Sequence, residues 1–480
     1  MKATKLAGLQ PESVFAYFEK LCSIPRGSGN TKQISDWLMT FARERNLEAY
    51  QDELNNVIII KEATPGYENA APVILQGHTD MVCEKTADCP KDMEREGLDL
   101  AVEGDTIYAI NTTLGGDDGI AVALALAVLD AQDLQHPRVE TVFTVDEEIG
   151  MLGAAGLNVS CLKGRRLLNI DTEKEGIFTV SCAGGVVTQC VLPLKRAAFE
   201  GVGMKVTVGG LAGGHSGIEI DKERGNSNLL MGRVLYAAAQ KVNLRLVDVN
   251  GGLKDNAIPR ETVATVVTAD PEALKVLCGE MNAVLKNEYR ITDPDVFVSV
   301  SETDAVLPMD EATTRKAICF LTTVPNGVQT MSAEIPGLVQ TSMNLGVLKT
   351  SEIELYGASC VRSSVETQKQ MLVERIRCLG EMLGAEVTTQ GDYAGWEYRP
   401  DSPLRNLLAE VFEEQNGYQP KIEAFHAGLE CGVLISKLPG LDCVSIGPDL
   451  EEIHTVKERL YIGSTQRLWN LVTETLKRMK

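Results

Sequence analysis

Short apolar runs that end in polar residues alternate with helical stretches, and this alternation constrains the fold more than any other feature. The strands are expected at residues 57–61, 72–77, 140–145, 165–170 and 441–448, and the helices at 120–130, 402–416 and 464–479. Strands that read as continuous apolar runs between helices are typical of a mainly parallel sheet with helices on both faces. The chain is therefore predicted to be an α/β protein.

The middle of the chain has a different pattern of apolar and polar residues. Alternating strands such as 202–211 are mixed there with helices such as 226–242. A chain of 480 residues is too long for one ordinary core, so more than one domain is expected. We predict one domain made of residues 1–186 and 398–480, interrupted by an α+β insert over 187–397. The insert is long enough to hold two similar halves.

The charge of the chain argues against two classes of partner. Acidic residues number 67 against 46 basic residues, which gives a formal net charge of −21 at pH 7. Nucleic acids and anionic membranes bind basic patches, so neither is an expected partner. No apolar run is long enough to cross a bilayer.

The cysteines indicate a reducing compartment. The chain has 12 cysteines, none of them in a CxxC pair, and several lie inside apolar runs, where they read as small core residues. The first residues form an amphipathic pattern without the apolar region of a signal peptide. We therefore expect the protein in the cytoplasm.

Polar side chains gather where the predicted strands end. They are His78 and Asp80, the adjacent pair Glu147 and Glu148, and Asp171, with Asp117 in the Gly-rich loop before the helix 120–130. Parallel α/β sheets bind ligands beyond the carboxyl ends of their strands. So many carboxylates at one edge would repel one another strongly unless cations lie between them. Imidazole and carboxylate together suit zinc, manganese or cobalt better than calcium.

Two such ions with near-tetrahedral shells need about six to seven ligand atoms, which calls for a second histidine. His454 lies just past the last predicted strand, at the same sheet edge, and is the preferred candidate. His426 is near the site in chain order but follows a less regular segment, and His215 lies in the insert. His136 lies in a loop after a helix, which predicts a surface position.

The adjacent acids Glu147 and Glu148 allow a division of labour. Side chains of neighbouring residues diverge, so one can face an ion while the other faces a water molecule bound to that ion. An ion of this class lowers the pKa of its bound water to about 7. A nearby glutamate can take the proton and pass it to a leaving amine. The pair therefore predicts a hydrolytic site.

In combination, the motifs of the chain resemble those of the M20 metallopeptidases, and most closely the aminoacyl-histidine dipeptidase branch. They are GHTD (77–80), GGDDG (115–119), DEEIG (146–150), NIDTE (169–173), GGHSG (213–217), NAIP (256–259) and IHTVKE (453–458), with HSGIEIDKERGNSN and FHAGLECG as further matches. The similarity covers nearly the whole chain. No motif is specific alone, but their combination is.

The resemblance implies a ligand set for two ions. His78 and Asp171 would bind one ion. Glu148 and His454 would bind the other, and Asp117 would bridge the two. The peptide bond after the bridging aspartate is often cis in this family. Such a bond costs about 3 kcal/mol outside proline, so its presence would indicate function.

The resemblance also implies catalytic roles. Asp80 would fix the imidazole ring of His78, as a ring that binds a metal usually requires. Glu147 would be the general base. The insert would act as a lid, in which His215 stabilises the oxyanion of the tetrahedral intermediate.

Three more residues of the chain match substrate-binding positions of the family. Asn256 and Arg362 would grip the carbonyl group and the C-terminal carboxylate of the substrate, and the forked guanidinium suits the latter. Gly428 would offer its backbone N–H to the same carboxylate. The match at Arg362 is short, and an arginine beside a strand is commonly a surface residue.

The activity implied by the resemblance is hydrolysis of small unblocked dipeptides, preferentially Xaa-His dipeptides including β-alanyl-histidine. Two divalent ions per chain are expected, zinc first, with cobalt or manganese as alternatives. We expect a small peptide substrate and a homodimer. A tripeptidase or an N-acyl amino acid deacylase of the same family remains open, as does an inactive protein that binds metal or peptide.

Overall fold

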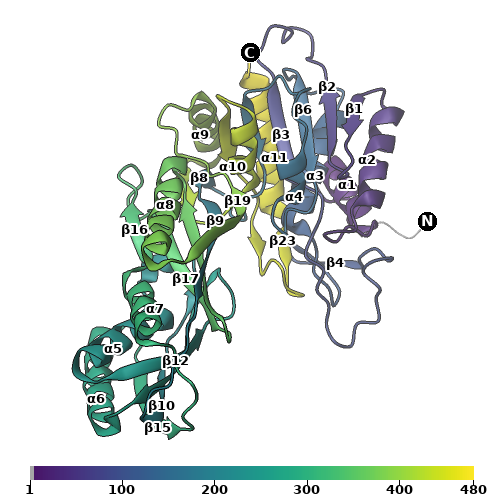
Figure 1. Ribbon diagram of the computed structural model, residues 1–480. Coiled ribbons are helices and arrows are strands. Elements are labelled where there is room, and N and C mark those ends of the chain that lie inside the picture. The colour runs from purple at the N-terminus through teal and green to yellow at the C-terminus, as the bar shows by residue number, and fades with distance from the viewer. Residues whose placement is uncertain (1–4) are drawn as a thin grey trace. The chain divides into compact units, whose positions relative to one another are not determined.

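The computed structural model describes residues 5–480 and shows two compact units (Figure 1). Unit 1 comprises Met1–Ser181, Tyr398–Ala424 and Leu429–Lys480, and unit 2 comprises Cys182–Glu397 and Phe425–Gly428. The sequence-based boundaries were 186/187 and 397/398. Unit 2 therefore begins five residues before the predicted boundary. It also includes the short segment Phe425–Gly428, which the sequence had assigned to the other domain.

An eight-stranded sheet forms the centre of unit 1, in the order β1-β2-β6-β3-β7-β21-β8-β20. Its strands are β1 (Glu48–Gln51), β2 (Val57–Lys61), β3 (Val73–His78), β6 (Val139–Thr144), β7 (Arg166–Asn169), β8 (Ile177–Cys182), β20 (Lys421–Phe425) and β21 (Asp442–Ser445). β3 pairs in parallel with β6 and β7, and β7 pairs in parallel with β21. The central strands are thus parallel, whereas β1, β2 and β8 add antiparallel pairs towards the edges.

Helices cover both faces of this sheet. The helices of unit 1 are α1 (Glu12–Cys22), α2 (Lys32–Glu44), α3 (Gly116–Asp130), α4 (Leu152–Gly156), α9 (Pro403–Asn416), α10 (Glu430–Lys437) and α11 (Ile462–Arg478). α1, α2, α3, α9 and α11 share one core with Val73 and Leu75 of β3. Because side chains alternate along a strand, Gln76 faces the other way, and there it contacts Glu430 of α10.

A smaller sheet of unit 1 has the order β22-β23-β5-β4. Its strands are β4 (Leu100–Glu103), β5 (Thr106–Ala109), β22 (Leu450–Glu451) and β23 (Arg459–Tyr461). Leu460 of β23 aligns with Ile107 of β5, so the sheet ties the C-terminal part of the chain to an early segment. The connection between β22 and β23 carries His454.

Unit 2 contains a nine-stranded sheet with the main order β15-β10-β14-β12-β17-β18-β9-β19, and β16 pairs with β17. The strands are β9 (Gly184–Pro193), β10 (Val202–Gly209), β12 (Leu244–Gly251), β14 (Thr262–Thr268), β15 (Phe297–Thr303), β16 (Gly327–Met331), β17 (Val339–Thr350), β18 (Glu354–Ser363) and β19 (Glu386–Tyr393). The helices are α5 (Ser227–Lys241), α6 (Pro271–Glu288), α7 (Glu311–Thr323) and α8 (Glu366–Leu383), with a short 3-10 helix at Ile220–Lys222. A two-stranded sheet pairs β11 (Gly214–His215) with β13 (Ala257–Ile258).

The order of these elements shows two similar halves. One half runs β10–α5–β12–β14–α6–β15, and the other runs β9–α7–β17–β18–α8–β19, with the first half inserted after β9. Each half follows the pattern strand-helix-strand-strand-helix-strand. The halves join where Gly251 of β12 pairs with Leu348 of β17, and their helices share one apolar core.

The structure confirms the predicted α/β class. The helix expected at 226–242 is α5, whose N-cap Asn226 accepts hydrogen bonds from the backbone of Asn228 and Leu229. The surface position predicted for His136 is wrong. This residue is fully buried, its backbone N–H donates to Thr64 Oγ1, and its Nδ1 lies 2.7 Å from the Pro137 carbonyl oxygen. Within residues 5–480, no helix is both long and apolar enough to span a membrane.

Candidate active site

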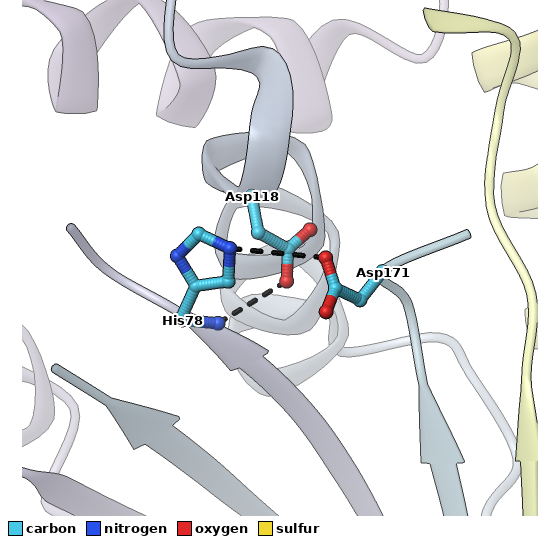
Figure 2. A group of neighbouring side chains, drawn as sticks. All are labelled: His78, Asp118 and Asp171. Atoms are coloured by element: carbon cyan, nitrogen blue, oxygen red, sulfur yellow. Dashed lines mark hydrogen bonds and ion pairs between the residues drawn. The ribbon is translucent and has the colours of Figure 1, made fainter. Parts of the chain in front are cut away.

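The site begins where β3 ends, at His78. The backbone N–H of His78 donates to Asp118 Oδ2 at 3.1 Å, and its Nε2 lies 3.7 Å from Asp171 Oδ1 (Figure 2). Asp171 follows β7, which pairs in parallel with β3. The parallel register therefore brings together two strand ends that are far apart in the sequence, as the strand-end argument predicted.

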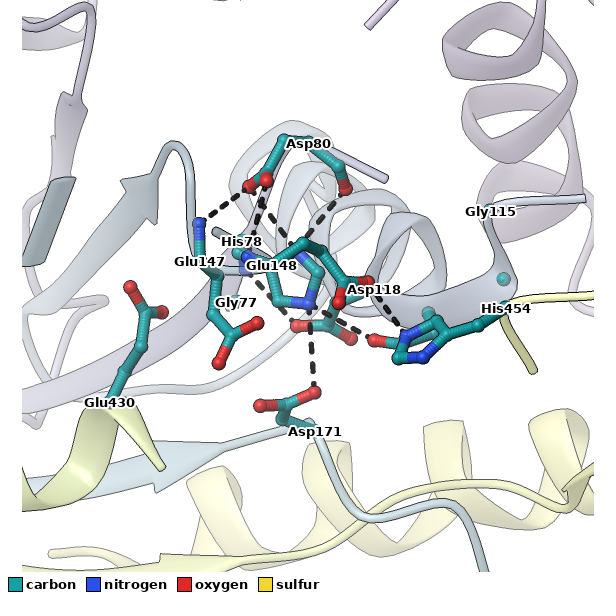
Figure 3. A network of polar contacts seen from close by, with 12 residues as sticks. Gly77, His78, Asp80, Gly115, Asp118, Glu147, Glu148, Asp171, Glu430 and His454 are labelled. Carbon is teal, nitrogen blue, oxygen red and sulfur yellow. Dashed lines mark hydrogen bonds and ion pairs between the residues drawn. The ribbon is translucent and has the colours of Figure 1, made fainter. Parts of the chain in front are cut away.

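Asp117 lies between two imidazole rings. Its Oδ1 is 3.0 Å from His78 Nε2, and its Oδ2 is 3.2 Å from His454 Nε2. Glu148 Oε1 is 2.9 Å from the same nitrogen of His454 (Figure 3). The peptide bond between Asp117 and Asp118 is cis. A carboxylate with one oxygen directed at each histidine has the arrangement needed to bridge two ions.

Three groups of side chains present ligand atoms that lie within 4.8 Å of one another. The groups are His78 with Asp118 and Asp171, His78 with Glu147 and Glu148, and Asp117 with Glu148 and His454. Imidazole nitrogen and carboxylate oxygen are the ligand atoms that zinc and related divalent ions accept. The donor set therefore fits two such ions.

Asp118 is a neighbour of the site that sequence reasoning did not assign. Its carboxylate is buried, and one oxygen accepts the backbone N–H of His78. A Cβ atom at Gly77 would lie 2.5 Å from that oxygen, so only glycine leaves room for it. In the sequence, its position directly after Asp117 in the GGDDG motif is the only feature that indicates a role at the site.

The carboxylates of the site perturb one another. Burial and the nearby Asp118 raise the pKa of Asp171 well above its ordinary value. Burial, and then the charges of Glu430 and Glu148, raise the pKa of Glu147 to about 8. These directions show that negative charge is crowded here beyond what the buried groups tolerate alone.

The pKa values of the two histidines are raised as well, which favours their charged form. Hydrogen bonds from His454 to the carboxylates of Asp117 and Glu148 raise its pKa to about 10. Burial opposes a proton on His78, but Asp117 and Asp80 raise its pKa well above the ordinary value. Metal binding requires neutral imidazoles, so divalent ions would take the place of these protons as the positive charges of the site.

Asp80 connects His78 with the turn that carries Glu147 and Glu148. Its Oδ1 lies 3.4 Å from His78 Nδ1 and accepts the backbone N–H of Glu147 at 3.1 Å. Its Oδ2 accepts the hydroxyl of Ser28 at 2.7 Å. One fully buried carboxylate thus orients the ring of His78 and also holds the turn that carries Glu147 and Glu148.

Two buried residues that the sequence did not single out hold the loop of Asp117. The carboxylate of Glu458 accepts the backbone N–H groups of Leu114, Gly115 and Gly116 at 2.7, 2.9 and 2.7 Å. The guanidinium of Arg26 donates to the carbonyl groups of Thr79, Asp80 and Gly115. Glu458 closes the IHTVKE motif, which was its only signal in the sequence.

The remaining predicted site residues lie in unit 2. His215 pairs with Ala257 across β11 and β13, and the backbone N–H of Ser216 donates to the Asn256 carbonyl at 2.9 Å. Arg362, on β18, is only 6% exposed, so it is not a surface arginine. Its Nη1 donates to the hydroxyl of Tyr393 at 3.1 Å.

Gly217 shows how closely the side chains of unit 2 approach one another. A Cβ atom there would lie 2.5 Å from the His426 carbonyl oxygen, 3.0 Å from His215 Cε1 and 3.2 Å from Arg362 Nε. His426 Nε2 lies 2.8 Å from the hydroxyl of Ser342. Gly428 belongs to the same short segment as His426. The structure thus groups His215 and Arg362 with His426.

Burial, and then the charges of Arg362 and His215, lower the pKa of His426 to about 3. Burial and Arg362 likewise lower the pKa of His215. Both rings are therefore neutral near pH 7. A neutral imidazole can donate one N–H, so each can act as a hydrogen-bond donor without adding charge beside the guanidinium.

Comparisons with known proteins support this picture. The chain is 37% identical, over 99% of its length and 99% of the relative's, to a cytosol non-specific dipeptidase of Escherichia coli. It matches the crystal structure of an aminoacylhistidine dipeptidase from Vibrio alginolyticus with a TM-score of 0.94 and 35% identity, over 99% of this chain and 98% of the other. A tripeptidase from Staphylococcus aureus shares the fold, with a TM-score of 0.56 at 16% identity over 98% of this chain and 99% of the other. The model of peptidase family M20/M25/M40 matches residues 74–478, and the chain therefore belongs to this family of metallopeptidases.

Proposed function

We propose that the protein is a dipeptidase that uses two divalent ions and prefers Xaa-His dipeptides, including β-alanyl-histidine. The observation that carries the proposal is Asp117 between His78 and His454, with Glu148 and Asp171 beside them. The relatives reported above at 37% and 35% identity are both dipeptidases by name.

In the proposed site, His78 and Asp171 would hold one ion, Glu148 and His454 would hold the other, and Asp117 would be shared. Zinc is the first expectation, with cobalt and manganese as alternatives, because all three accept this donor set. Ions of this class supply Lewis acidity and lower the pKa of water to about 7.

Glu147 is the proposed proton carrier. It stands next to Glu148, so it is close to the ions, but no hydrogen bond to an imidazole of the site occupies it within residues 5–480. Burial and neighbouring carboxylates raise its pKa to about 8, near the pH at which a base must both take and release a proton. It would remove a proton from the attacking water and deliver it to the leaving amine.

The side chains of unit 2 are the proposed binders of the substrate backbone. Arg362 would pair with the C-terminal carboxylate, aided by the N–H of Gly428 and by the neutral ring of His426. His215 would donate to the carbonyl oxygen as it gains charge, and Asn256 would hold the carbonyl group. Tyr393 supports this proposal, since its hydroxyl accepts from Arg362 Nη1 and limits the movement of the guanidinium.

A substrate panel tests the proposal. Purified protein with added zinc, manganese or cobalt is assayed on β-alanyl-histidine, Ala-His, Ala-Ala, a tripeptide and an N-acetyl amino acid. We expect kcat/KM for the Xaa-His dipeptides to exceed that for Ala-Ala at least about tenfold, with little cleavage of the last two. Equal rates on all dipeptides would remove the histidine preference but keep the dipeptidase. Cleavage of the tripeptide or the acylated amino acid alone would show a tripeptidase or a deacylase instead of a dipeptidase. No hydrolysis of any substrate would indicate a protein that binds metal or peptide without cleaving it.

Two further expectations remain predictions. The relative from Escherichia coli is a cytosol enzyme by name, which supports a cytoplasmic location here. A homodimer is also proposed. β15 forms one end of the sheet in unit 2, and an end strand has backbone groups that a second copy could pair with.

A further inference from the structure

A row of buried polar side chains crosses the sheet just below the metal ligands. Gln76, Thr144 and Asn169 are each at most 1% exposed. Gln76 aligns with Asn169 in the pairing of β3 with β7, and Thr144 aligns with His78 in the pairing of β3 with β6. Alternate residues of a strand face the same side, so Gln76 lies on the same face of β3 as His78, one step below it.

Glu430, the first residue of α10, closes this row. Its Oε2 accepts hydrogen bonds from Gln76 Nε2 at 2.5 Å and from Thr144 Oγ1 at 2.6 Å. Asn169 Nδ2 in turn donates to Gln76 Oε1 at 2.6 Å. These contacts join the ends of three strands whose following residues include His78, Glu147 and Asp171. Figure 3 shows Glu430 reaching from its helix towards the carboxylate of Glu147.

The carboxylate of Glu430 is incompletely compensated. It is fully buried, and its Oε1 has no hydrogen-bond partner among residues 5–480. Burial raises its pKa to about 7, with His78 acting in the opposite direction and Asp80 in the same one. A buried charge without adequate partners destabilises a folded protein. Something must therefore favour a glutamate at this position.

We propose that Glu430 is a positioning residue for the divalent ions, whose positive charge compensates its buried carboxylate. The inference rests on the proposed function, because it requires that the site bind such ions. Its hydrogen bonds to Gln76, two residues before His78 on β3, and to Thr144, which aligns with His78, place its carboxylate close to that proposed ligand. It adds negative charge behind the ligands and holds the strands that carry them, which strengthens metal binding.

The replacement Glu430→Gln tests this role, because it removes the charge and keeps the shape and an acceptor oxygen. If the ions compensate the charge, the metal-free variant is more stable than the metal-free wild type. We expect its Tm to rise by about 2 °C or more. Metal affinity, measured by calorimetric titration with zinc or cobalt, should fall about 10- to 100-fold, the range known for groups that support metal ligands. If Glu430 were merely structural, its replacement would lower the Tm of the metal-free protein and leave metal affinity unchanged.

Glu140 provides the matched control. It is also a fully buried glutamate of unit 1, on β6, but its charge already has partners. Its Oε1 accepts from Arg138 Nε at 2.8 Å, and its Oε2 accepts the backbone N–H groups of Lys163 and Gly164 at 2.9 Å each. Glu140→Gln should therefore lower the Tm of the metal-free protein and leave metal affinity within about threefold.

The outcomes separate this inference from the proposed function. If the wild type binds no divalent ions, the proposed function itself fails. If the wild type binds two ions and Glu430→Gln binds them equally well, only the role of Glu430 is overturned. A metal-free Glu430→Gln protein that unfolds at lower temperature, or does not fold, also overturns it, because removal of the charge is expected to stabilise that state.

Discussion

At the scale of single residues, Glu147 and Glu148 show how neighbours in sequence take different tasks. Glu148 Oε1 lies 2.9 Å from His454 Nε2, in a group of side chains that could hold a metal ion. Glu147 is held through its backbone by Asp80, and burial together with neighbouring carboxylates raises its pKa. Asp80 also contacts the ring of His78. A single turn thus places the proposed ligand and the proposed base side by side.

The replacement Glu147→Gln should abolish proton transfer without removing a ligand. We expect kcat to fall about 10³-fold, within the range for loss of a general base, while metal content stays at the wild-type level. Steady-state kinetics on a dipeptide and metal analysis of the same sample check both parts. Asp146→Asn is the control from the same turn and should keep kcat within about threefold. A variant that keeps more than a tenth of the activity, or that loses its metal, would contradict the role of Glu147.

The buried ring of His426 predicts a loss of stability in acid. Its pKa is about 3 in the folded protein and near 6.5 when exposed. Below about pH 6.5 the unfolded chain binds a proton that the folded chain does not, so this contribution to stability is lost as the pH falls from 6.5 towards 3. The slope approaches about 1.4 kcal/mol per pH unit. Above pH 6.5 the residue adds no pH dependence.

The variant His426→Gln, which can still bond to Ser342, isolates this contribution. Thermal unfolding of wild type and variant is followed from pH 7.5 to pH 4.5. The stability of the wild type relative to the variant should decrease as the pH falls below 6.5. A difference that does not change with pH would show that His426 takes up a proton in the folded protein.

At the scale of elements, the strand ends were predictable because they follow from local periodicity. The apolar run at 57–61 corresponds to β2 with the same bounds, and the run at 140–145 corresponds to β6 (Val139–Thr144) within one residue at each end. In a parallel sheet, residues that follow consecutive strands must meet at one edge, so His78 and Asp171 could be placed together before their distance was known. The second histidine, His454, was harder to place from the sequence, because it lies in the connection between β22 and β23 of the smaller sheet.

The supports of the site could not be read from the sequence in this way. Glu458 binds the loop of Asp117 from more than 340 positions away, and Glu430 reaches Gln76 across 354 positions. Such contacts depend on how helices and hairpins pack, which periodicity does not specify. The same reason explains the wrong placement of His136, because a loop after a helix looks exposed until the segment around Thr64 covers it.

At the scale of the whole molecule, the chemistry divides between the two units. The three groups that could hold a metal ion all lie in unit 1, whereas His215, Asn256, Arg362 and Gly428 lie in unit 2. Each unit has its own apolar core. A ligand stabilises the folded form that binds it, so if the two units unfold independently, metal ions should stabilise unit 1 more than unit 2.

Removal of metal therefore tests this division. Chelation should lower the Tm of unit 1 by several degrees, since repulsion among Asp117, Glu148 and Asp171 is then no longer balanced, and hydrogen exchange should increase in the loops after β3, β6 and β7. The backbone of β17 and β18 in unit 2 should exchange at an unchanged rate. Scanning calorimetry and hydrogen exchange with mass spectrometry, before and after chelation and after zinc is restored, measure both effects. If exchange in β17 and β18 increased as much as in the loops, the ions would stabilise both units together. If exchange did not change anywhere, the carboxylates of unit 1 would be held in place without metal ions.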